Sequence, residues 1–569
     1  MICLSLNTKS RSPLITSSIL LTTSLTLFTF QLGHAQTQAD LIAAPGDGTN
    51  VLMQGMGYNA WRFSPLKKIN VNNVKKLVPV WNMSTNNSSG DVAQPLLYDG
   101  IIYYTTGKST YGVDAISGRM LWKHELDYAS DVPMAAPSGL VNRGPAIYEG
   151  ILMRTTLDAH VVALDIKTGK EIWKTKSDDY KLGYSMSVAP LIAEGVLIVG
   201  VGGGENGARC YIEGYNPKTG AKLWRKYTVP APGEPGSETW PKDDSWKRGG
   251  GPAWLTGSYD PKAGLVYWGT GNPSPWNAQY RPGDNLYTSS VLALRPATGE
   301  VVWHYQFTPN DTFDFDGNNE LVLADIKVGD RTRSVVMQAN RNGYLYVLDR
   351  LSGELLAANP FTKTTWANGI DLKTGRPNET ADVKRMKATG EKITVAPAAF
   401  GGKNWNPMSF NPSTGLLYAN VLVNEWDYMP VKQDYVVGAP WFALDAKWRF
   451  DQDKGGILKA MDPLTGKVKW QQPWTIASWS GTLSTAGNLV FSGAMSGEFF
   501  AFDASTGKKL WSFQTGSGIN SQPITWQKNG KQFVTVASGI GTVYLTFAGD
   551  ERLRTAPIGG SLWTFALQP

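Results

Sequence analysis

One hydrophobic and polar pattern recurs along most of this chain. A short apolar run leads into a polar turn that ends in Thr-Gly or Ser-Gly, and a second apolar run follows that often ends in Trp. Apolar runs around a glycine-containing turn are typical of β-hairpins. Complete copies have the turns Ser117-Gly118, Thr168-Gly169, Thr219-Gly220, Thr298-Gly299, Thr465-Gly466 and Thr506-Gly507, followed by Trp122, Trp173, Trp224, Trp303, Trp470 and Trp511. The segment Asp349–Gly353 is a copy without the Trp.

The spacing of these copies predicts a repeat architecture. The first three Trp residues of the pattern are 51 residues apart, and the last two are 41 apart. Such a period, with about four short strands per unit, is typical of β-propeller blades. The longer gap before the last pair predicts further blades with inserted loops at residues 360–400 and 425–455. Because helical periodicity is scarce, we expect an all-β fold with the repeated Trp side chains wedged between blades.

Composition narrows the class without naming a function. Hydrophobic residues make up 42% of the 569 residues and charged residues 18%, which indicates a globular protein. The net charge of +7 is small for this length and gives no reason to expect a nucleic-acid partner. The two cysteines, Cys3 and Cys210, allow no internal disulfide once the first is removed with a leader, and there is no Cys-x-x-Cys-His motif for an attached haem.

The amino terminus has the features of an export signal. Lys9 and Arg11 precede an apolar stretch over residues 12–32, and Gly33-His34-Ala35 supplies small residues for cleavage near Gln36. The stretch is long enough to span a membrane, so an anchor is the alternative. Its many Ser and Thr residues favour removal. We therefore expect a signal peptide over 1–35, a single propeller domain over 36–569, no anchor after cleavage and a periplasmic location.

Five side chains that carry oxygen or positive charge stand out among the glycine-rich loops. Glu205 follows three glycines, Asn272 lies in Gly-Asn-Pro, Asp314 and Asp316 flank a Phe, and Arg341 lies in Asn-Arg-Asn-Gly. Carboxylate and amide oxygens are ligands that suit one hard cation, and an Arg beside them could polarise a ligand carbonyl. Residues this far apart meet only if loops converge, as they do at the axis of a propeller.

Longer motifs stand in a fixed order along the chain. They are Arg62-Phe63-Ser64-Pro65-Leu66 with Ile69-Asn70, Val141-Asn142-Arg143-Gly144, Asp244-Ser245-Trp246-Lys247, Gly249-Gly250-Gly251, Gly269-Thr270-Gly271-Asn272-Pro273, Arg281-Pro282-Gly283-Asp284-Asn285 and Asp349-Arg350. From about residue 57 to its end the chain thereby resembles the methanol/ethanol family of pyrroloquinoline quinone (PQQ) dehydrogenases. The resemblance implies an eight-bladed β-propeller with PQQ and one metal ion in its axial funnel.

The resemblance also implies roles for individual residues. Glu205, Asn272 and Asp314 match metal ligands, Asp314 also matches the catalytic carboxylate, and Arg341 matches the basic residue that hydrogen-bonds the quinone oxygens. The other cofactor positions are Trp254 beneath the planar ring, Arg143 against a PQQ carboxylate, Ser187 where Thr is frequent, Gly202 where Ser is frequent, Gly203, and Asn404, Trp405 and Trp479 near the quinone.

Three departures from the family pattern concern the cofactor. Pro137 and Ser138 replace an adjacent pair of cysteines that often forms a disulfide ring above PQQ. Val92 replaces a Glu that helps to hold PQQ, and neighbouring Asp91 is a candidate substitute. Pro252 replaces a Thr just before the stacking region.

Asp316 bears on the identity of the metal. An Asp at this place resembles the family members that use a trivalent lanthanide, and an extra carboxylate would balance the extra positive charge. In an extended segment residues two apart point to the same side, so Asp314 and Asp316 are expected to face one ion. The alternative is calcium, with Asp316 as a solvated or hydrogen-bonded loop residue.

The expected activity is the oxidation of an alcohol to an aldehyde or ketone. Asp314 would take the hydroxyl proton as general base, the hydride would pass to PQQ, and the metal and Arg341 would polarise the quinone and stabilise its developing charge. Because the chain has no haem motif, the electrons would pass to an external acceptor such as a soluble cytochrome c. A homodimer is compatible with the family pattern.

Two other functions are consistent with parts of the sequence. A non-enzymatic propeller that assists protein assembly in the cell envelope would share the Trp and Thr-Gly repeat but would not need the ligand residues. A quinoprotein acting on a sugar, a polymer or a large secondary alcohol would keep the reaction class, and the missing cysteine pair and inserted loops leave room for it.

Overall fold

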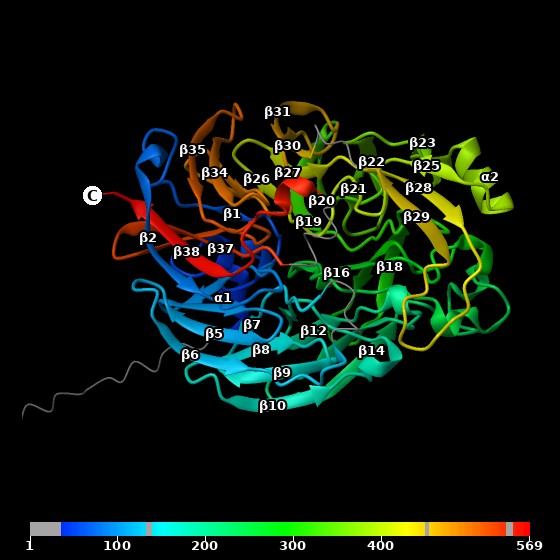
Figure 1. Ribbon diagram of the computed structural model, residues 1–569, viewed down its shortest axis with the longest axis horizontal. Coiled ribbons are helices and arrows are strands. Elements are labelled where there is room, and N and C mark those ends of the chain that lie inside the picture. Colours follow the sequence, from blue (N-terminus) through cyan, green and yellow to red (C-terminus); the bar gives the residue numbers. More distant parts are fainter. Residues whose placement is uncertain (1–35, 133–138, 450–454, 542–549, 569) are drawn as a thin grey trace, which may run out of the picture. The chain divides into compact units, whose positions relative to one another are not determined.

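The chain folds into small β-sheets joined by loops (Figure 1). The computed structural model describes residues 36–132, 139–449, 455–541 and 550–568. In these ranges the only α-helices are α1 (Gln38–Ala43) and α2 (Ala381–Thr389), so the predicted all-β class is confirmed. None of the helices there is long and apolar enough to cross a membrane. The predicted signal peptide, residues 1–35, and the positions Pro137 and Ser138 lie outside the described residues.

Five sheets each consist of four consecutive strands. Their neighbouring strands pair antiparallel, as expected for successive hairpins. The strands are β3 (Leu96–Tyr98), β4 (Ile101–Thr105), β5 (Ser109–Asp114) and β6 (Met120–Glu125); β7 (Ala146–Tyr148), β8 (Ile151–Thr155), β9 (His160–Asp165) and β10 (Glu171–Lys176); β11 (Leu191–Ala193), β12 (Val196–Gly200), β13 (Tyr211–Tyr215) and β14 (Lys222–Tyr227); β15 (Ser258–Asp260), β16 (Leu265–Thr270), β17 (Ser290–Leu294) and β18 (Val301–Gln306); and β19 (Val322–Val328), β20 (Arg331–Ala339), β21 (Tyr344–Asp349) and β22 (Leu355–Pro360).

Three further sheets combine strands that are not consecutive in the chain. They are β26 (Ser409–Asn411), β27 (Leu416–Leu422), β30 (Gly456–Met461) and β31 (Val468–Trp474); β1 (Phe63–Ser64), β32 (Leu483–Thr485), β33 (Leu489–Gly493), β34 (Glu498–Asp503) and β35 (Lys509–Gln514); and β2 (Leu77–Ser84), β38 (Ser561–Leu567), β37 (Lys531–Ser538) and β36 (Ile524–Lys528). In Figure 1 the sheets follow one another in chain order around a common centre.

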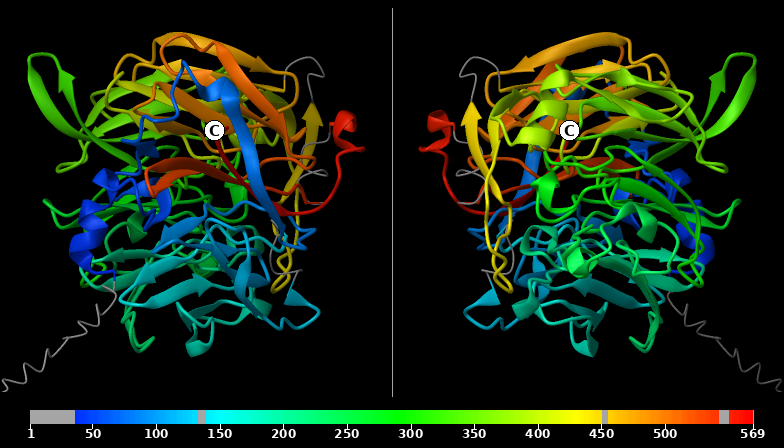
Figure 2. Two further views of the ribbon diagram at one scale, coloured as in Figure 1. Left: turned by 90° about the vertical axis from the view of Figure 1, so that its left-hand side faces the viewer. Right: turned by 90° about the vertical axis from the view of Figure 1, so that its right-hand side faces the viewer.

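One sheet joins the two ends of the described chain. Strand β2 pairs antiparallel with β38, from Leu77 opposite Leu567 to Ser84 opposite Ser561. Figure 2 shows the blue strand β2 beside the orange and red strands of the chain end. Pairing between residues so distant in sequence ties the amino-terminal part of the described chain to its carboxyl-terminal strand within one sheet.

The two predicted insertions form structure outside the larger sheets. Residues 360–400 contain the hairpin of β23 (Ala367–Ile370) and β24 (Pro377–Glu379), the helix α2 and the short β25 (Ile393–Val395). Strand β25 continues into a three-stranded sheet with β28 (Glu425–Pro430) and β29 (Leu444–Arg449). The insertions therefore build an additional small sheet, in which β28 and β29 belong to the second insertion.

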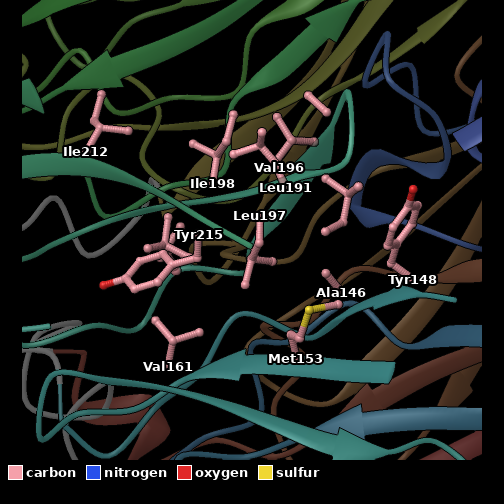
Figure 3. Close-up of a cluster of buried hydrophobic side chains, with 14 of the residues drawn as sticks. Ala146, Tyr148, Met153, Val161, Leu191, Val196, Leu197, Ile198, Ile212 and Tyr215 are labelled. Carbon is pink, nitrogen blue, oxygen red and sulfur yellow. The ribbon is translucent and has the colours of Figure 1, made fainter. Parts of the chain in front are cut away.

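Apolar side chains of adjacent sheets fill the space between them. Figure 3 shows this for sheets β7–β10 and β11–β14, where Met153 and Val161 face Leu197. All three side chains are fully buried. At roughly 25 cal/mol per Å² of buried apolar surface, such packing between sheets supplies much of the driving force for folding.

Five of the six repeated Trp residues contact the turn glycine of the following sheet. The rings of Trp122, Trp173, Trp224, Trp303 and Trp470 lie only 2.4 to 2.7 Å from where a Cβ would stand on Gly169, Gly220, Gly299, Gly353 and Gly507, respectively. These glycines have φ between 70° and 78°, so both the ring and the backbone exclude a side chain there. In the copy without a Trp, Asn359 packs on Gly466 instead, and its Nδ2 donates to the carbonyl of Leu464 at 2.9 Å.

Candidate active site

The loops of three neighbouring sheets hold the five residues singled out for chemistry. Glu205 lies in the short helical turn η6 (Gly204–Asn206), between β12 and β13. Asn272 follows directly after β16, and Asp314 and Asp316 lie between β18 and β19. Arg341 lies in the turn between β20 and β21.

The Asn-Arg-Asn-Gly turn is folded by its own side chains. The side-chain oxygen of Asn340 accepts the backbone N–H of Asn342 at 2.9 Å, and that of Asn342 accepts the N–H of Tyr344 at 3.1 Å. Gly343 takes φ +92°, which disfavours other residues. Nδ2 of Asn340 donates to the carbonyl of Asp316 at 3.0 Å, so the turn that carries Arg341 is tied to the aspartate loop.

Arg341 bridges both aspartates. Its Nη1 lies 2.7 Å from Oδ2 of Asp314, and its Nη2 lies 3.1 Å from Oδ2 of Asp316. The two carboxylates thus face one cation, but our reason for expecting this was wrong. Asp314 has φ +63°, in the left-handed region, so the segment turns at Asp314 and does not run as an extended strand.

Glu205, Asn272 and Asp316 form a compact set of donor atoms. One amide position of Asn272 lies 3.3 Å from both Oε1 of Glu205 and Oδ1 of Asp316. With the amide nitrogen there, it donates to both carboxylates and the amide oxygen accepts from Trp276 Nε1 at 3.0 Å. With the amide oxygen there, three oxygen groups converge, which is the arrangement that a hard cation requires.

The charges of this set favour a bound cation. Three carboxylates, the fully buried one of Asp316 and the partly buried ones of Glu205 and Asp314, are close to the single guanidinium of Arg341. Burial raises the pKa of Glu205 to about 7, and the charge of Asp316 adds to this shift. Burial likewise raises the pKa of Asp314 well above its usual value, although the charge of Arg341 opposes this. A cation would remove this penalty.

The carboxylates alone do not enclose a metal site. In the ranges that the structure describes, no three His, Cys, Asp or Glu side chains stand close enough together to hold an ion. Oδ2 of Asp314 instead accepts a hydrogen bond from Nη1 of Arg341 at 2.7 Å. Its Oδ1 is buried without a hydrogen-bond partner among the described residues, as is Nε of Arg341. These two atoms are the orphaned polar groups that a ligand would satisfy.

A cavity beside the donor set is lined by every residue predicted to contact the cofactor. These are Arg143, Ser187, Gly202, Gly203, Trp254, Arg341, Asn404, Trp405 and Trp479, together with Glu205 and Asp314. The structure therefore brings together all the predicted cofactor positions, whereas Asn272 and Asp316 are adjacent to the cavity without lining it.

The cavity wall combines aromatic faces with hydrogen-bond donors. The guanidinium of Arg143 lies 4.5 Å from the ring centre of Trp254 and donates to the hydroxyl of Ser187. Nε1 of Trp254 donates to Oδ2 of Asp316 at 3.1 Å, which fixes the indole ring. At Gly203, with φ +124°, a Cβ would stand 2.3 Å from the carbonyl of Gly183, so this part of the wall must be bare backbone. Such a site suits a flat, acidic ligand.

Four aromatic side chains of the cavity were not predicted. Trp276, Phe400, Trp426 and Phe442 line it together with the predicted residues. Phe400 is the last residue of the first insertion, and Trp426 and Phe442 lie in the second insertion. The sequence predicted these insertions as loops and assigned them no part in the site. The density of aromatic residues in 425–455 was the available signal.

The departures from the family pattern have different structural outcomes. Asp91 is fully buried and accepts hydrogen bonds from Thr85 at 3.1 Å and Asn87 at 2.8 Å, and it does not line the cavity, so it does not replace the missing Glu here. Val92 lines a smaller neighbouring cavity. The carbonyl of Pro252 accepts the N–H of Gly271 at 2.6 Å, next to Asn272.

Comparison with known proteins identifies the family. Residues 53–360 and 444–534 match the family model described as PQQ, glucose/ethanol/alcohol dehydrogenase, β-propeller domain. The quinoprotein alcohol dehydrogenase PedH of Pseudomonas putida is 41% identical over 98% of this chain and 97% of its own length. The 1-butanol dehydrogenase (quinone) of Thauera butanivorans is 38% identical over 91% of this chain and 92% of its own.

A solved structure agrees with these relatives. A europium-containing methanol dehydrogenase superposes with a TM-score of 0.89 and 34% identity, and the match covers 93% of this chain and 100% of that one. The chain therefore belongs to the family of PQQ-dependent alcohol dehydrogenases, which have a β-propeller fold. The predicted resemblance is confirmed. The alternative that the chain is a non-enzymatic assembly protein is therefore excluded.

Proposed function

We propose that this chain oxidises an alcohol with PQQ and one metal ion bound in the cavity described above. The observation that carries the proposal is the convergence of Glu205, Asn272 and Asp316 beside the pair of Asp314 and Arg341, at the wall of a cavity with aromatic and cationic sides. When bound, PQQ supplies the hydride acceptor, and the metal supplies a Lewis acid that polarises it.

The protein's own part is to hold the reactants and move a proton. Asp314 takes the hydroxyl proton of the alcohol at Oδ1, the oxygen that has no partner among the described residues. Arg341 keeps Oδ2 in place at 2.7 Å and offers its Nε to developing negative charge. Trp254 supplies an aromatic face for the cofactor, and Arg143 with Ser187 supplies donors for a carboxylate.

The metal ligands in this proposal are Glu205, Asn272, Asp314 and Asp316. A trivalent lanthanide is favoured over calcium because a fourth protein ligand with a negative charge is available and because a structural relative contains europium. The remaining cofactor residues, Gly202, Gly203, Asn404, Trp405 and Trp479, surround the ligand.

The aromatic side of the cavity indicates the substrate class. Trp276, Trp426 and Phe442 line the cavity together with Asp314, and they offer few hydrogen bonds to a polyhydroxylated molecule. We therefore favour an alcohol with an apolar substituent over a sugar. A comparison of kcat/KM for 1-butanol, 2-phenylethanol and glucose tests this, and a preference for glucose would contradict it.

Further parts of the proposal concern the whole protein. The eight sheets of four or five strands are taken as eight blades, and the contacts between Trp rings and turn glycines as the device that docks one blade on the next. Residues 1–35 act as a signal peptide and direct residues 36–569 to the periplasm. There the electrons pass to an external acceptor such as a soluble cytochrome c, and the enzyme acts alone or as a homodimer.

Reconstitution tests the proposed activity directly. PQQ-free protein is loaded with PQQ plus either La³⁺ or Ca²⁺, and alcohol oxidation is followed with an artificial dye acceptor. We expect turnover only with both PQQ and metal present. Turnover that is unchanged without PQQ, or no turnover with any alcohol in either metal, would refute the proposal.

A further inference from the structure

Arg281 is a fully buried arginine that none of the roles above uses. It directly follows the short helical turn η9 (Ala278–Tyr280), and its side chain has no exposed surface. In the part of the chain that the structure describes, no carboxylate lies within 4.0 Å of its guanidinium. Burial lowers the pKa of Arg281 to about 9, although the charge of nearby Asp311 opposes this shift, so burying this guanidinium without a direct ion pair is costly. A residue kept at that cost needs a specific explanation.

The guanidinium binds backbone carbonyls of two separate loops. Its Nε donates to the carbonyl of Pro275 at 2.7 Å, and its Nη2 donates to the carbonyl of Trp276 at 3.0 Å. The same Nη2 donates to the carbonyl of Asp311, and Nη1 donates to Oδ1 of Asn285 at 2.7 Å. Four of its N–H groups are therefore used, three of them on main-chain oxygens.

Both of these loops carry members of the candidate metal site. Pro275 and Trp276 follow Asn272 by three and four residues, and Asp311 precedes Asp314 by three. A second, weaker connection lies beside the first, because the hydroxyl of Thr312 donates to the same carbonyl of Trp276 at 2.7 Å. Arg281 thus fixes the distance between the loop of Asn272 and the loop of Asp314 and Asp316.

We infer that Arg281 is a positioning residue that presets the spacing of the metal-binding loops, and thereby sets metal affinity without touching the ion. This inference rests on the proposed metal site. Its chemical basis is the planar fork of arginine, which spans several carbonyls at once, whereas the single ammonium of lysine cannot do so. Replacing residues that hold metal ligands from behind typically lowers metal affinity by about 10- to 100-fold.

Arg154 provides a matched control. It is also fully buried and also binds main-chain oxygens, with Nη1 on Ser109 at 2.9 Å and Nη2 on Thr106 at 2.8 Å and Gly107 at 3.0 Å. Arg154 lies in β8, and these partners lie in β5 and the turn before it, so none of them belongs to the loops of the metal site. Arg154→Lys should therefore lower thermal stability as Arg281→Lys does, but leave metal binding unchanged.

The experiment measures metal binding by thermal stabilisation. Wild type, Arg281→Lys, Arg154→Lys and Thr312→Val are loaded with PQQ, and the melting temperature is followed against the concentration of La³⁺ and, separately, of Ca²⁺. We expect the metal concentration that produces a given rise in melting temperature to be about 10- to 100-fold higher for Arg281→Lys than for wild type. This metal concentration should increase by a smaller factor for Thr312→Val, and for Arg154→Lys it should equal that of wild type.

The outcomes separate this inference from the proposed function. No metal-dependent shift in wild type refutes the metal site itself and the inference with it. If metal raises the melting temperature of wild type, and Arg281→Lys needs the same metal concentration for the same rise, then Arg281 has only a structural role and the inference is overturned. If Arg281→Lys does not fold, the test uses Thr312→Val, which removes a hydrogen bond between the same two loops. If that variant needs the same metal concentration as wild type for the same rise in melting temperature, the inference is also overturned.

Discussion

Exchanging Asp316 for Asn isolates the charge that is proposed to select a trivalent metal. The side chain is fully buried, and its Oδ1 accepts the N–H of Asn272 at 2.6 Å while its Oδ2 accepts Nε1 of Trp254 at 3.1 Å. Asp316→Asn keeps the volume and one acceptor oxygen. The main change is therefore the loss of one negative charge near Glu205 and the Asn272 amide, and with it the ion pair to Nη2 of Arg341 at 3.1 Å.

The magnitude follows from the distances in the donor set. Oδ1 of Asp316 lies 3.3 Å from the Asn272 amide, so an ion bound there is within about 4 Å of the carboxylate. At that distance one pair of unit charges interacts by about 4 kcal/mol at an effective dielectric constant of about 20. A lanthanide carries one charge more than calcium. Asp316→Asn should therefore lower the ratio of La³⁺ to Ca²⁺ affinity by up to about 10³-fold.

The assay compares the two metals in one protein. PQQ-loaded wild type and Asp316→Asn are titrated with La³⁺ and, separately, with Ca²⁺. At each metal concentration the melting temperature and the rate of turnover with a dye acceptor are recorded. Asp91→Asn is the matched control, because Asp91 is equally buried but does not line the cavity. An unchanged ratio of the two affinities in Asp316→Asn would show that the ion does not sense this carboxylate, and the lanthanide assignment would fail.

Three more predictions test other residues. Asp314→Ala should abolish turnover, and Asp314→Asn should reduce it about 10²- to 10⁴-fold because the general base is lost; substantial turnover in the Asn variant would rule out that role. Trp254→Ala should weaken PQQ binding about tenfold in a titration of PQQ-free protein without unfolding it, and an unchanged affinity would place the ring outside the cofactor site. Burial raises the pKa of Asp91 from 3.8 to about 7, so the folded state holds a proton that the unfolded state has lost, and the free energy of unfolding should fall as pH rises from about 4 to about 7. Asp91→Asn should remove this decrease in the free energy of unfolding, which is at most about 4 kcal/mol. Melting curves at about pH 5 and about pH 8 test it. If the variant kept the wild-type pH dependence, the raised pKa would not belong to Asp91.

The repeat could be predicted from the sequence because each copy depends on a short, contiguous segment of the chain. A turn glycine next to a β-rich run has one conformation in every copy, and in five of the six copies the Trp that follows packs on a turn glycine of the next sheet, as Trp224 does on Gly299. Where a copy lacked the Trp, the sequence offered no substitute. Asn359, which packs on Gly466, lies two residues beyond the place where the Trp of other copies stands in its strand, so only the folded structure identifies it.

The members of the candidate site could be predicted, and so could part of its wall, but four of its aromatic wall residues could not. Glu205, Asn272 and Arg341 lie in turns whose glycines and asparagines mark them as loops, so their meeting followed from the architecture. Three of the four unpredicted aromatic residues, Phe400, Trp426 and Phe442, come from the insertions, whose positions no repeat period fixes. Trp426 lies in β28, which pairs with β25 some thirty residues earlier in the chain. Long-range pairing of this kind leaves no local signal.

The backbone at Asp314 shows why two roles can meet in one carboxylate. An extended segment would have directed Asp314 and Asp316 to the same side by alternation, but φ +63° at Asp314 turns its carboxylate independently of its neighbour. Oδ2 then pairs with Arg341 at 2.7 Å, while Oδ1 is left without a partner among the described residues. A carboxylate held by one oxygen keeps the other for a metal ion or a substrate proton, and the buried guanidinium opposes the rise in pKa that burial imposes. Removing Arg341 would therefore take from Asp314 both the hydrogen bond that orients it and the positive charge that opposes the rise in its pKa, which is why the pair, and not either residue alone, is the unit on which the proposed chemistry depends.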